Sequence, residues 1–293
     1  MRRILILMTA FLLMISCSKK DDRSDAYGNF ESTEITISAQ GNGELLSFDI
    51  NEGESLQEKQ VVGQIDTTIL MIKKKQVLDN MELMSSKIQS AELNLKAMKR
   101  QKELLQKEQN RVKDLFDKEA TTEQNLDKIT TELDVSNLKI KALMQDITSL
   151  KIQKQSLNNQ LNEILENLSK TRIINPINGV VLTKYKEPKE LVSAGILLYK
   201  IADLQKMYLK IFVSATQLDD IKIGQKVEVL IDRNEDDFHK LSGKITWISA
   251  SSEFTPKNIQ TKEERVDQVY AVKVLVKNDG KIKIGMPGEV NFY

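Results

Sequence analysis

The longest regular pattern in this chain is a repeat of apolar residues at alternating intervals of four and three positions. It runs from Leu70 to Phe116 and returns in a different phase from Leu126 to Leu168. This spacing places the side chains on one stripe of an α-helix, as in the seam of a coiled coil. Residues 64–175 contain no glycine or proline, which favours uninterrupted helices. The pattern predicts two helices, each of about 48 residues and roughly 70 Å long.

A polar stretch, RVKDLFDKEATTEQNLD, separates the two apolar patterns at residues 111–127. Continuing the first phase beyond Phe116 would bring Glu119 and Glu123 onto the seam. Carboxylates at these positions would be buried without partners, so the first helix has to end here and a second one begin.

Equal lengths and a short connection predict that the two helices form an antiparallel hairpin. We expect this hairpin to span residues 67–170, with its turn near residues 117–122. Thr121, followed three residues later by Gln124, fits a capping box at the start of the second helix.

The segments on either side of the predicted hairpin share a pattern. Residues 43–66 and residues 179–203 each begin with a glycine and an apolar strand, pass through a polar turn to an apolar pair, and end in a short segment with an aspartate. Neither half is long enough to bury a core alone. We therefore expect residues 31–66 and 171–204 to form one small β domain with internal pseudo-two-fold symmetry.

Residues 205–293 predict a second β-rich domain, because short alternating segments separated by glycine turns are typical of a small barrel. Trp247 lies in the middle of one such segment and is expected in the core. His239 follows an acidic loop and is expected at the surface. Together the patterns predict an α+β protein in which a long helical hairpin is inserted into a β domain that a small β-barrel follows.

The N-terminal residues 1–16 have the features of a secretory signal peptide. Two arginines precede a mostly apolar run that is shorter than the ~20 residues needed to span a bilayer. The sequence Met-Ile-Ser-Cys at the end of this run resembles a bacterial lipobox, which implies that Cys17 carries a lipid anchor. Residues 17–30 would then be a charged tether. The alternative is an ordinary signal peptide cleaved nearby, with Cys17 incidental.

Composition argues against several classes of function. The 43 basic and 42 acidic residues leave a net charge of +1, which gives no electrostatic reason for nucleic-acid binding. One histidine and one cysteine offer too few ligands for a zinc site. No nucleophile elbow, phosphate-binding loop or dinucleotide-binding glycine pattern occurs. We therefore expect neither catalytic residues nor enzymatic activity.

The two β halves resemble those of a biotinyl/lipoyl domain, and NPINGVV at residues 175–181 is similar to a stretch of that family. A lipoyl-like domain split by a long helical hairpin resembles the HlyD-type periplasmic adaptors, also called membrane fusion proteins. The resemblance implies a β-barrel domain at 205–293, with a minimal or absent membrane-proximal domain. The hairpin replaces the turn that carries the modified lysine in lipoyl domains, so Lys73–Lys75 are expected on a helix, without lipoylation or any other cofactor.

The same resemblance implies partners and a docking site. Adaptors of this family contact an outer-membrane channel of the TolC type through the hairpin tip, in a pattern of Arg, three residues, Leu, six residues and a hydroxyl residue. Arg111, Leu115 and Thr122 have this spacing, with threonine in place of serine. The alternative is purely structural, with Leu115 packing the turn and Thr122 capping a helix.

A second stretch, SSEFTPKNIQTKEER at residues 251–265, resembles one in adaptors that work with ATP-driven (ABC) exporters. The resemblance implies a loop facing the transporter that includes Phe254, Thr255, Pro256 and Arg265. The alternative is a surface loop that only ends two strands.

Three functions follow from these observations. The first is an adaptor in the periplasm, anchored to the inner membrane through Cys17, which joins an exporter, ABC-type favoured, to a TolC-like channel as a homo-hexamer. The second is a structural coiled-coil lipoprotein that spaces the envelope without transport. The third, a lipoyl- or biotin-carrying enzyme subunit, requires an acceptor lysine on a tight turn and a cytoplasmic chain, and the sequence offers neither.

Overall fold

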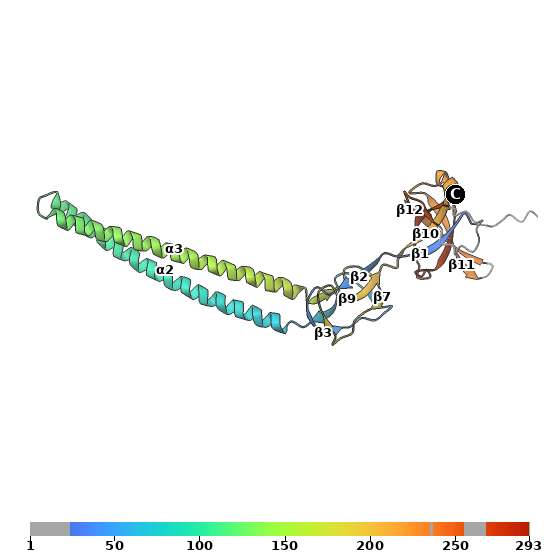
Figure 1. Ribbon diagram of the computed structural model, residues 1–293, viewed down its shortest axis with the longest axis horizontal. Coiled ribbons are helices and arrows are strands. Elements are labelled where there is room, and N and C mark those ends of the chain that lie inside the picture. Colours follow the sequence, from blue (N-terminus) through green and yellow to red (C-terminus); the bar gives the residue numbers. More distant parts are fainter. Residues whose placement is uncertain (1–23, 235–236, 255–267, 293) are drawn as a thin grey trace, which may run out of the picture.

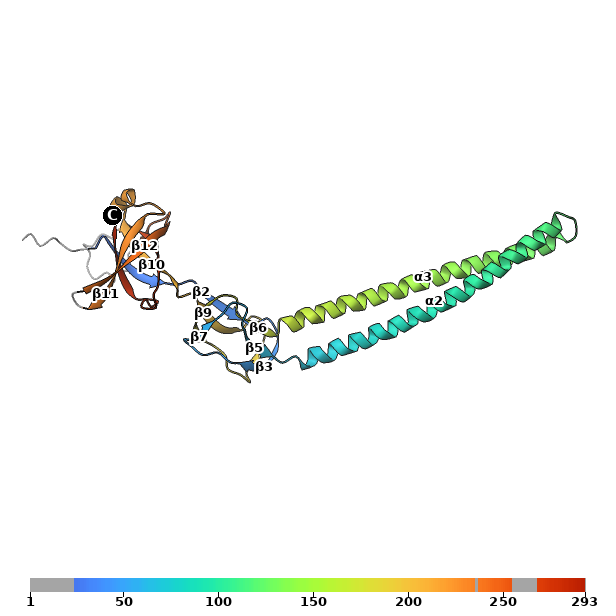
Figure 2. The same cartoon turned by 180° about the vertical axis from the view of Figure 1, so that it is seen from behind.

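The computed structural model describes residues 24–234, 237–254 and 268–292. Three parts follow one another along the long axis of the molecule: a β-barrel, a smaller β domain and a helical hairpin (Figures 1 and 2). The described chain begins in the barrel, crosses the smaller domain, forms the hairpin, and returns through the smaller domain to the barrel. Both β domains are therefore built from residues on both sides of the hairpin.

The hairpin consists of α2 (Thr68–Phe116) and α3 (Glu123–Ser169), which run antiparallel. Its buried positions lie on the predicted seam, from about the middle of the hairpin towards the tip: Ile88, Ile129, Leu133, Ser136, Ile140 and Ile147. Near the smaller domain the two helices lie apart in both views (Figures 1 and 2), and seam residues such as Leu70 and Val77 are only half-buried. The seam is thus closed mainly in its distal part.

Two polar contacts between the helices fix their register. Gln109 Nε2 donates to Thr130 Oγ1 at 3.2 Å, near the tip. Lys151 Nζ lies 3.0 Å from Glu92 Oε1, farther down the hairpin. Since Gln109 occupies a seam position, its hydrogen bond satisfies a polar group that would otherwise disfavour burial.

The smaller domain contains two four-stranded sheets that exchange strands between the two halves of the sequence. Strand β4 of the first half pairs with β7 of the second, and β8 of the second pairs with β3 of the first. The two sheet orders, β2-β9-β7-β4 and β6-β5-β3-β8, become identical when each strand is replaced by its counterpart in the other half. The strands are β2 (Glu34–Ser38), β3 (Gly43–Phe48), β4 (Ser55–Leu56), β5 (Val61–Ile65), β6 (Arg172–Ile174), β7 (Gly179–Lys184), β8 (Leu191–Val192) and β9 (Leu197–Ala202).

The turns of this domain repeat the same symmetry. Left-handed backbone occurs at Gly53 (φ 84°) and at its counterpart Lys189 (φ 76°). It occurs again at Lys59 (φ 65°) and at its counterpart Gly195 (φ 92°). In each pair one half uses glycine, which adopts this conformation without strain, while the other uses lysine. The pseudo-two-fold relation therefore extends to the backbone conformation of the turns.

The barrel is a sheet of six strands closed on itself, in the order β10-β1-β15-β11-β12-β14, with β14 pairing again with β10. The short β13 pairs antiparallel with the first residues of β14. A short 3-10 helix, η1 (Ala215–Asp220), follows β10. The strands are β1 (Ala26–Glu31), β10 (Lys206–Ser214), β11 (Lys226–Asn234), β12 (Asp237–Ile248), β13 (Glu253–Phe254), β14 (Gln268–Lys277) and β15 (Pro287–Phe292).

The first barrel strand corrects the prediction that residues 17–30 are a tether. Residues 26–31 form β1, which lies between β10 and β15 and buries Phe30 completely. A Cβ at Gly28 would lie 1.8 Å from the carbonyl oxygen of Lys210, so only glycine permits this approach. The sequence did not reveal this strand because its partners, β10 and β15, lie far away along the chain, as the pairs Tyr27–Phe212 and Ala26–Val290 show.

The prediction that Trp247 belongs to the core was wrong. Its side chain is 41% exposed, and Lys273 Nζ lies 6.0 Å from the centre of its ring. The pairing of β12 with β14 shifts between Ile245, which is fully buried, and Trp247. Because a bulge adds one residue to the strand, it reverses the alternation and turns Trp247 outward. His239 is half-buried, with Nε2 3.9 Å from Asp279 Oδ2.

A buried polar network joins the two halves of the smaller domain. Asn175 is inaccessible to solvent. Its Nδ2 donates to the carbonyl oxygens of Gln57 and Ile177, and its Oδ1 accepts a hydrogen bond from the Tyr199 hydroxyl at 3.0 Å. Burial raises the pKa of Tyr199 well above its ordinary value, so this hydroxyl stays protonated and remains a donor.

We predict that Asn175→Ala destabilises the smaller domain by about 2–4 kcal/mol, because it leaves two carbonyl groups and one hydroxyl without partners in the interior. Tyr199→Phe, which leaves only one acceptor unpaired, should have a smaller effect. Hydrogen exchange of the β5 and β9 amides measures both changes. A change below about 0.5 kcal/mol for Asn175→Ala would contradict the role of this network.

Candidate functional site

At the tip of the hairpin, α2 ends in a turn that contains no glycine. The Ala120 amide donates to the carbonyl oxygen of Leu115 at 2.8 Å, and the Glu119 amide donates to that of Phe116 at 2.8 Å. These paired bonds are those of a Schellman motif, in which one residue adopts a left-handed backbone. Glu119, with φ of 56°, is that residue. These backbone hydrogen bonds therefore end α2 and start the reversal of the chain over residues 117–122.

The cap of α3 differs from the prediction by one residue. Thr122 has extended backbone angles, φ −94° and ψ 153°, and its hydroxyl accepts a hydrogen bond from the Asn125 amide at 3.4 Å. Thr121 instead accepts one from the Asn125 side chain at 3.3 Å. The predicted capping box of Thr121 and Gln124 was therefore wrong, because the last residue with extended backbone before the helix decides which side chain can cap it.

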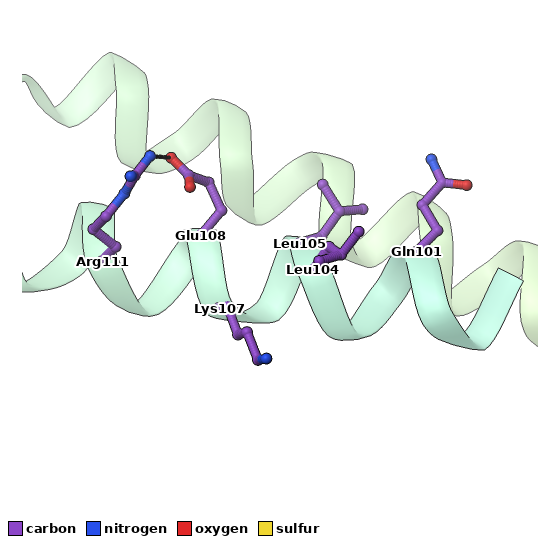
Figure 3. Close-up of a pocket in the computed structure, with 6 residues that line it drawn as sticks. All are labelled: Gln101, Leu104, Leu105, Lys107, Glu108 and Arg111. Carbon is purple, nitrogen blue, oxygen red and sulfur yellow. Dashed lines mark hydrogen bonds and ion pairs between the residues drawn. The ribbon is translucent and has the colours of Figure 1, made fainter. Parts of the chain in front are cut away.

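Arg111 lies on α2, close to its C-terminal end, and points outward. Its Nη2 lies 2.5 Å from Glu108 Oε1, and its side chain is 69% exposed. Figure 3 shows this pair at one end of a shallow groove that Leu104 and Gln101 also line. An exposed ion pair of this kind contributes only about 0–1 kcal/mol, so a partner could replace Glu108 at little cost.

Leu115 lies one turn beyond Arg111 on the same face of α2, because residues four apart are neighbours on a helix. Its side chain is 41% exposed and that of the adjacent Phe116 is 37% exposed. All residues from 113 to 120 are exposed. The structure thus presents Arg111, Leu115 and Thr122 to solvent at the end of the molecule farthest from the barrel (Figure 1).

A second apolar stripe, which the sequence analysis did not identify, follows the outer face of α2. Its residues are spaced by ten or eleven positions, close to three helical turns, so they share one face. Their side chains are between 41% and 68% exposed. We call this set the α2 stripe, and its members are Ile72, Leu83, Leu93, Leu104 and Leu115.

The outer face of α3 is uncharged over a similar length. Nine consecutive positions at alternating intervals of four and three are all exposed, and none carries a charge. We call this set the α3 stripe, and its members are Thr131, Val135, Leu138, Ala142, Gln145, Ser149, Ile152, Ser156 and Asn159. The signal was present in the sequence, at the outer positions of the heptads and away from the buried seam.

The remaining predicted site residues are placed only in part. Lys73–Lys75 lie in α2 near its start. Phe254 ends β13, whereas Cys17, Thr255, Pro256 and Arg265 lie outside the described residues. Within the described ranges, no group of three or more His, Cys, Asp or Glu side chains could hold a metal ion. No helix in that part of the chain is long and apolar enough to cross a membrane.

Comparison with known proteins yields relatives of nearly full length. No family model matches the chain. The sequence is 26% identical over 301 residues to the UPF0194 membrane protein YbhG of Salmonella gallinarum. The aligned region covers 94% of this chain and 90% of that protein. The similarity includes the hairpin and both β domains, since it extends over almost the whole chain.

Two solved structures share the architecture. MacA from Actinobacillus actinomycetemcomitans matches with a TM-score of 0.55 and 21% identity, over 91% of this chain and 76% of that one. The membrane fusion protein Spr0693 from Streptococcus pneumoniae R6 matches with a TM-score of 0.50 and 16% identity, over 91% of this chain and 97% of that one. The chain has the fold of a membrane fusion protein. The predicted α+β class, with a split lipoyl-like domain, a helical hairpin and a β-barrel, is thereby confirmed.

Proposed function

We propose that this protein is a non-catalytic periplasmic adaptor of a tripartite transport system, joining an inner-membrane exporter to a TolC-like outer-membrane channel. The observation that carries the proposal is the exposed tip, where Arg111, Leu115 and Thr122 lie at the end of a hairpin about 70 Å long. A leucine provides a small apolar anchor, and an arginine provides a planar fork for carbonyl or carboxylate groups. The barrel and the lipoyl-like domain would rest on the exporter.

The similarity to a membrane fusion protein and to YbhG supports this function. The stretch at 251–265 favours an ATP-driven exporter as the inner-membrane partner, with Phe254, Thr255, Pro256 and Arg265 facing it. A structural lipoprotein that only spaces the envelope is the second candidate. It requires no chemistry at the tip and gives no reason for the chain to build a strand-exchanged lipoyl-like domain.

We further propose that the adaptor works as a ring of copies, with six in the family that the sequence resembles. The α2 stripe of one hairpin would lie against the α3 stripe of the next, which is a head-to-tail contact that closes into a ring. The charges of the two helices favour this contact, because α2 is basic and α3 is slightly acidic. Helix α2 carries eleven basic and six acidic residues, whereas α3 carries five basic and seven acidic ones. Uncharged outer faces on both helices favour a hairpin that has neighbours on both sides.

A photo-crosslinking amino acid in place of Leu115 should capture an outer-membrane channel in living cells, because this side chain is exposed at the tip. The same probe in place of Lys139, an exposed residue on the side of α3, is the matched control and should not capture that channel. Mass spectrometry identifies the captured protein. Capture of the channel from neither position, or of only other copies of this chain, would favour the spacer function.

Introducing charge on the α2 stripe should weaken self-association. Leu93→Glu together with Leu104→Glu would bury two carboxylates in the proposed contact, and we expect at least a roughly tenfold weaker association. Asn94→Glu adds a negative charge one residue away but about 100° around the helix, so it should have little effect. Sedimentation velocity measures both variants. Equal behaviour of the two would exclude the stripe as the contact.

A lipid anchor at Cys17 would hold the barrel near the inner membrane, because few residues separate it from Ser24, where the described chain begins. Cys17→Ser should therefore abolish incorporation of labelled fatty acid and release the protein from the membrane fraction into the periplasm. If Cys17 is incidental, the variant will be processed and will fractionate like the natural protein.

A further inference from the structure

One outer face of the barrel is strongly basic. The strands β10, β14, β12 and β11 carry seven lysines, and three of these have a carboxylate partner among the described residues. Three lysines are neutralised: Lys210 by Glu253 at 3.2 Å, Lys240 by Glu228 at 3.2 Å, and Lys273 by Glu31 at 3.3 Å. The other four, for which the described part of the chain provides no ion pair, are Lys206, Lys226, Lys244 and Lys277.

The four unpaired lysines form two direct cross-strand pairs. Lys206 of β10 lies opposite Lys277 of β14, and Lys226 of β11 lies opposite Lys244 of β12. Like charges directly opposite each other in a sheet are destabilising. The fold therefore maintains two repulsive pairs around one groove, and no carboxylate is among the described residues that line it.

These lysines surround a groove of about 420 Å³. Leu275, which is half-buried, provides an apolar side chain on its floor, whereas Gly243 and Val276 face the barrel core and line the groove with their backbone. The aliphatic stems of the lysines extend this apolar surface, while their ammonium groups remain at the rim. The groove thus combines an uncharged floor with a concentrated positive rim.

The position of the groove favours a ligand from the aqueous phase. It begins at Lys206, the first residue of β10, which follows the lipoyl-like domain. Strand β1 runs antiparallel to β10 with Tyr27 opposite Phe212, so the N-terminal side of the chain lies at the other end of β10. A membrane that holds the N-terminus would face that other end.

We propose that this groove binds an anionic amphiphile from solution, with a phosphate or a similar doubly charged head at the lysine rim and a short apolar group on the floor. Lysine ammonium groups are compact point charges that suit phosphate. A bound dianion would replace two repulsive pairs by attractive ones, which accounts for their presence. The proposal is independent of the tip and of the transport partners.

The protein itself offers a matched control. Lys210 and Lys273 also lie directly opposite each other on β10 and β14, but each has its own glutamate. We compare two double variants of the full-length protein. One carries both Lys206→Gln and Lys277→Gln, and the other carries both Lys210→Gln and Lys273→Gln. Both variants remove two charges from the same pair of strands.

Binding is measured by calorimetry with four probes: dihexanoyl phosphatidic acid, dihexanoyl phosphatidylcholine, inorganic phosphate, and phosphatidylcholine vesicles with or without phosphatidylglycerol. We expect the phosphatidic acid to bind most tightly, and the Lys206/Lys277 variant to bind it roughly tenfold more weakly or worse. The Lys210/Lys273 variant should change the affinity by less than about twofold.

Other outcomes would overturn the proposal. Equal binding of inorganic phosphate would show that the apolar floor is not used. Binding to anionic vesicles alone would make the face a membrane-surface patch, and absence of binding to every probe would remove the site. An equal loss of affinity in both variants would show that the overall positive charge of the barrel, and not this groove, attracts the ligand.

A readout without ligand tests the repulsion itself. Loss of the Lys206–Lys277 pair should raise the thermal midpoint of the barrel, because it removes a like-charge contact. Loss of Lys210 and Lys273 should leave the midpoint unchanged or lower it, because two ion pairs disappear. Trp247 fluorescence reports on the barrel in both variants. A lower midpoint for the Lys206/Lys277 variant would contradict the argument.

Discussion

The exchange of strands within the lipoyl-like domain is the constraint on which the rest of the molecule depends. Strand β4 pairs with β7, and β8 pairs with β3, so neither half of the domain has a complete sheet by itself. The hairpin is inserted between the halves, and its two ends are fixed by the same sheets. The domain can therefore close only when α3 has returned along α2, which couples the folding of the hairpin to that of its base.

This coupling gives the long hairpin a defined direction. The buried part of its seam extends from about the middle of the hairpin, at Ile88, towards the tip, where Ile129 and Ile140 pack, while the lipoyl-like domain fixes the other end. A residue at the tip is thus held far from the barrel by backbone hydrogen bonds and one apolar seam. Such an arm suits a protein that connects two partners at a distance and has no need of a catalytic pocket.

The surfaces of the arm and the barrel both contain features that an isolated monomer would not favour. The α2 stripe exposes leucine and isoleucine to water, and the barrel keeps lysines opposite each other that form no ion pair with the described residues. Each arrangement has a cost in the free chain. Their chemistry differs, since one face matches another uncharged helix and the other matches an anion, so they indicate two separate kinds of contact.

The sequence by itself determined the hairpin, its length, the place of its turn and the relation between the two β halves, because these depend on local periodicity and on repeats. It also located Arg111 and Leu115 at the tip. Tertiary structure decided what depends on pairing between distant strands. Residues 26–31 became a barrel strand, a bulge turned Trp247 outward, and the register of β10 with β14 brought Lys206 opposite Lys277. No local pattern contains this information, because each of these outcomes depends on which strand lies alongside.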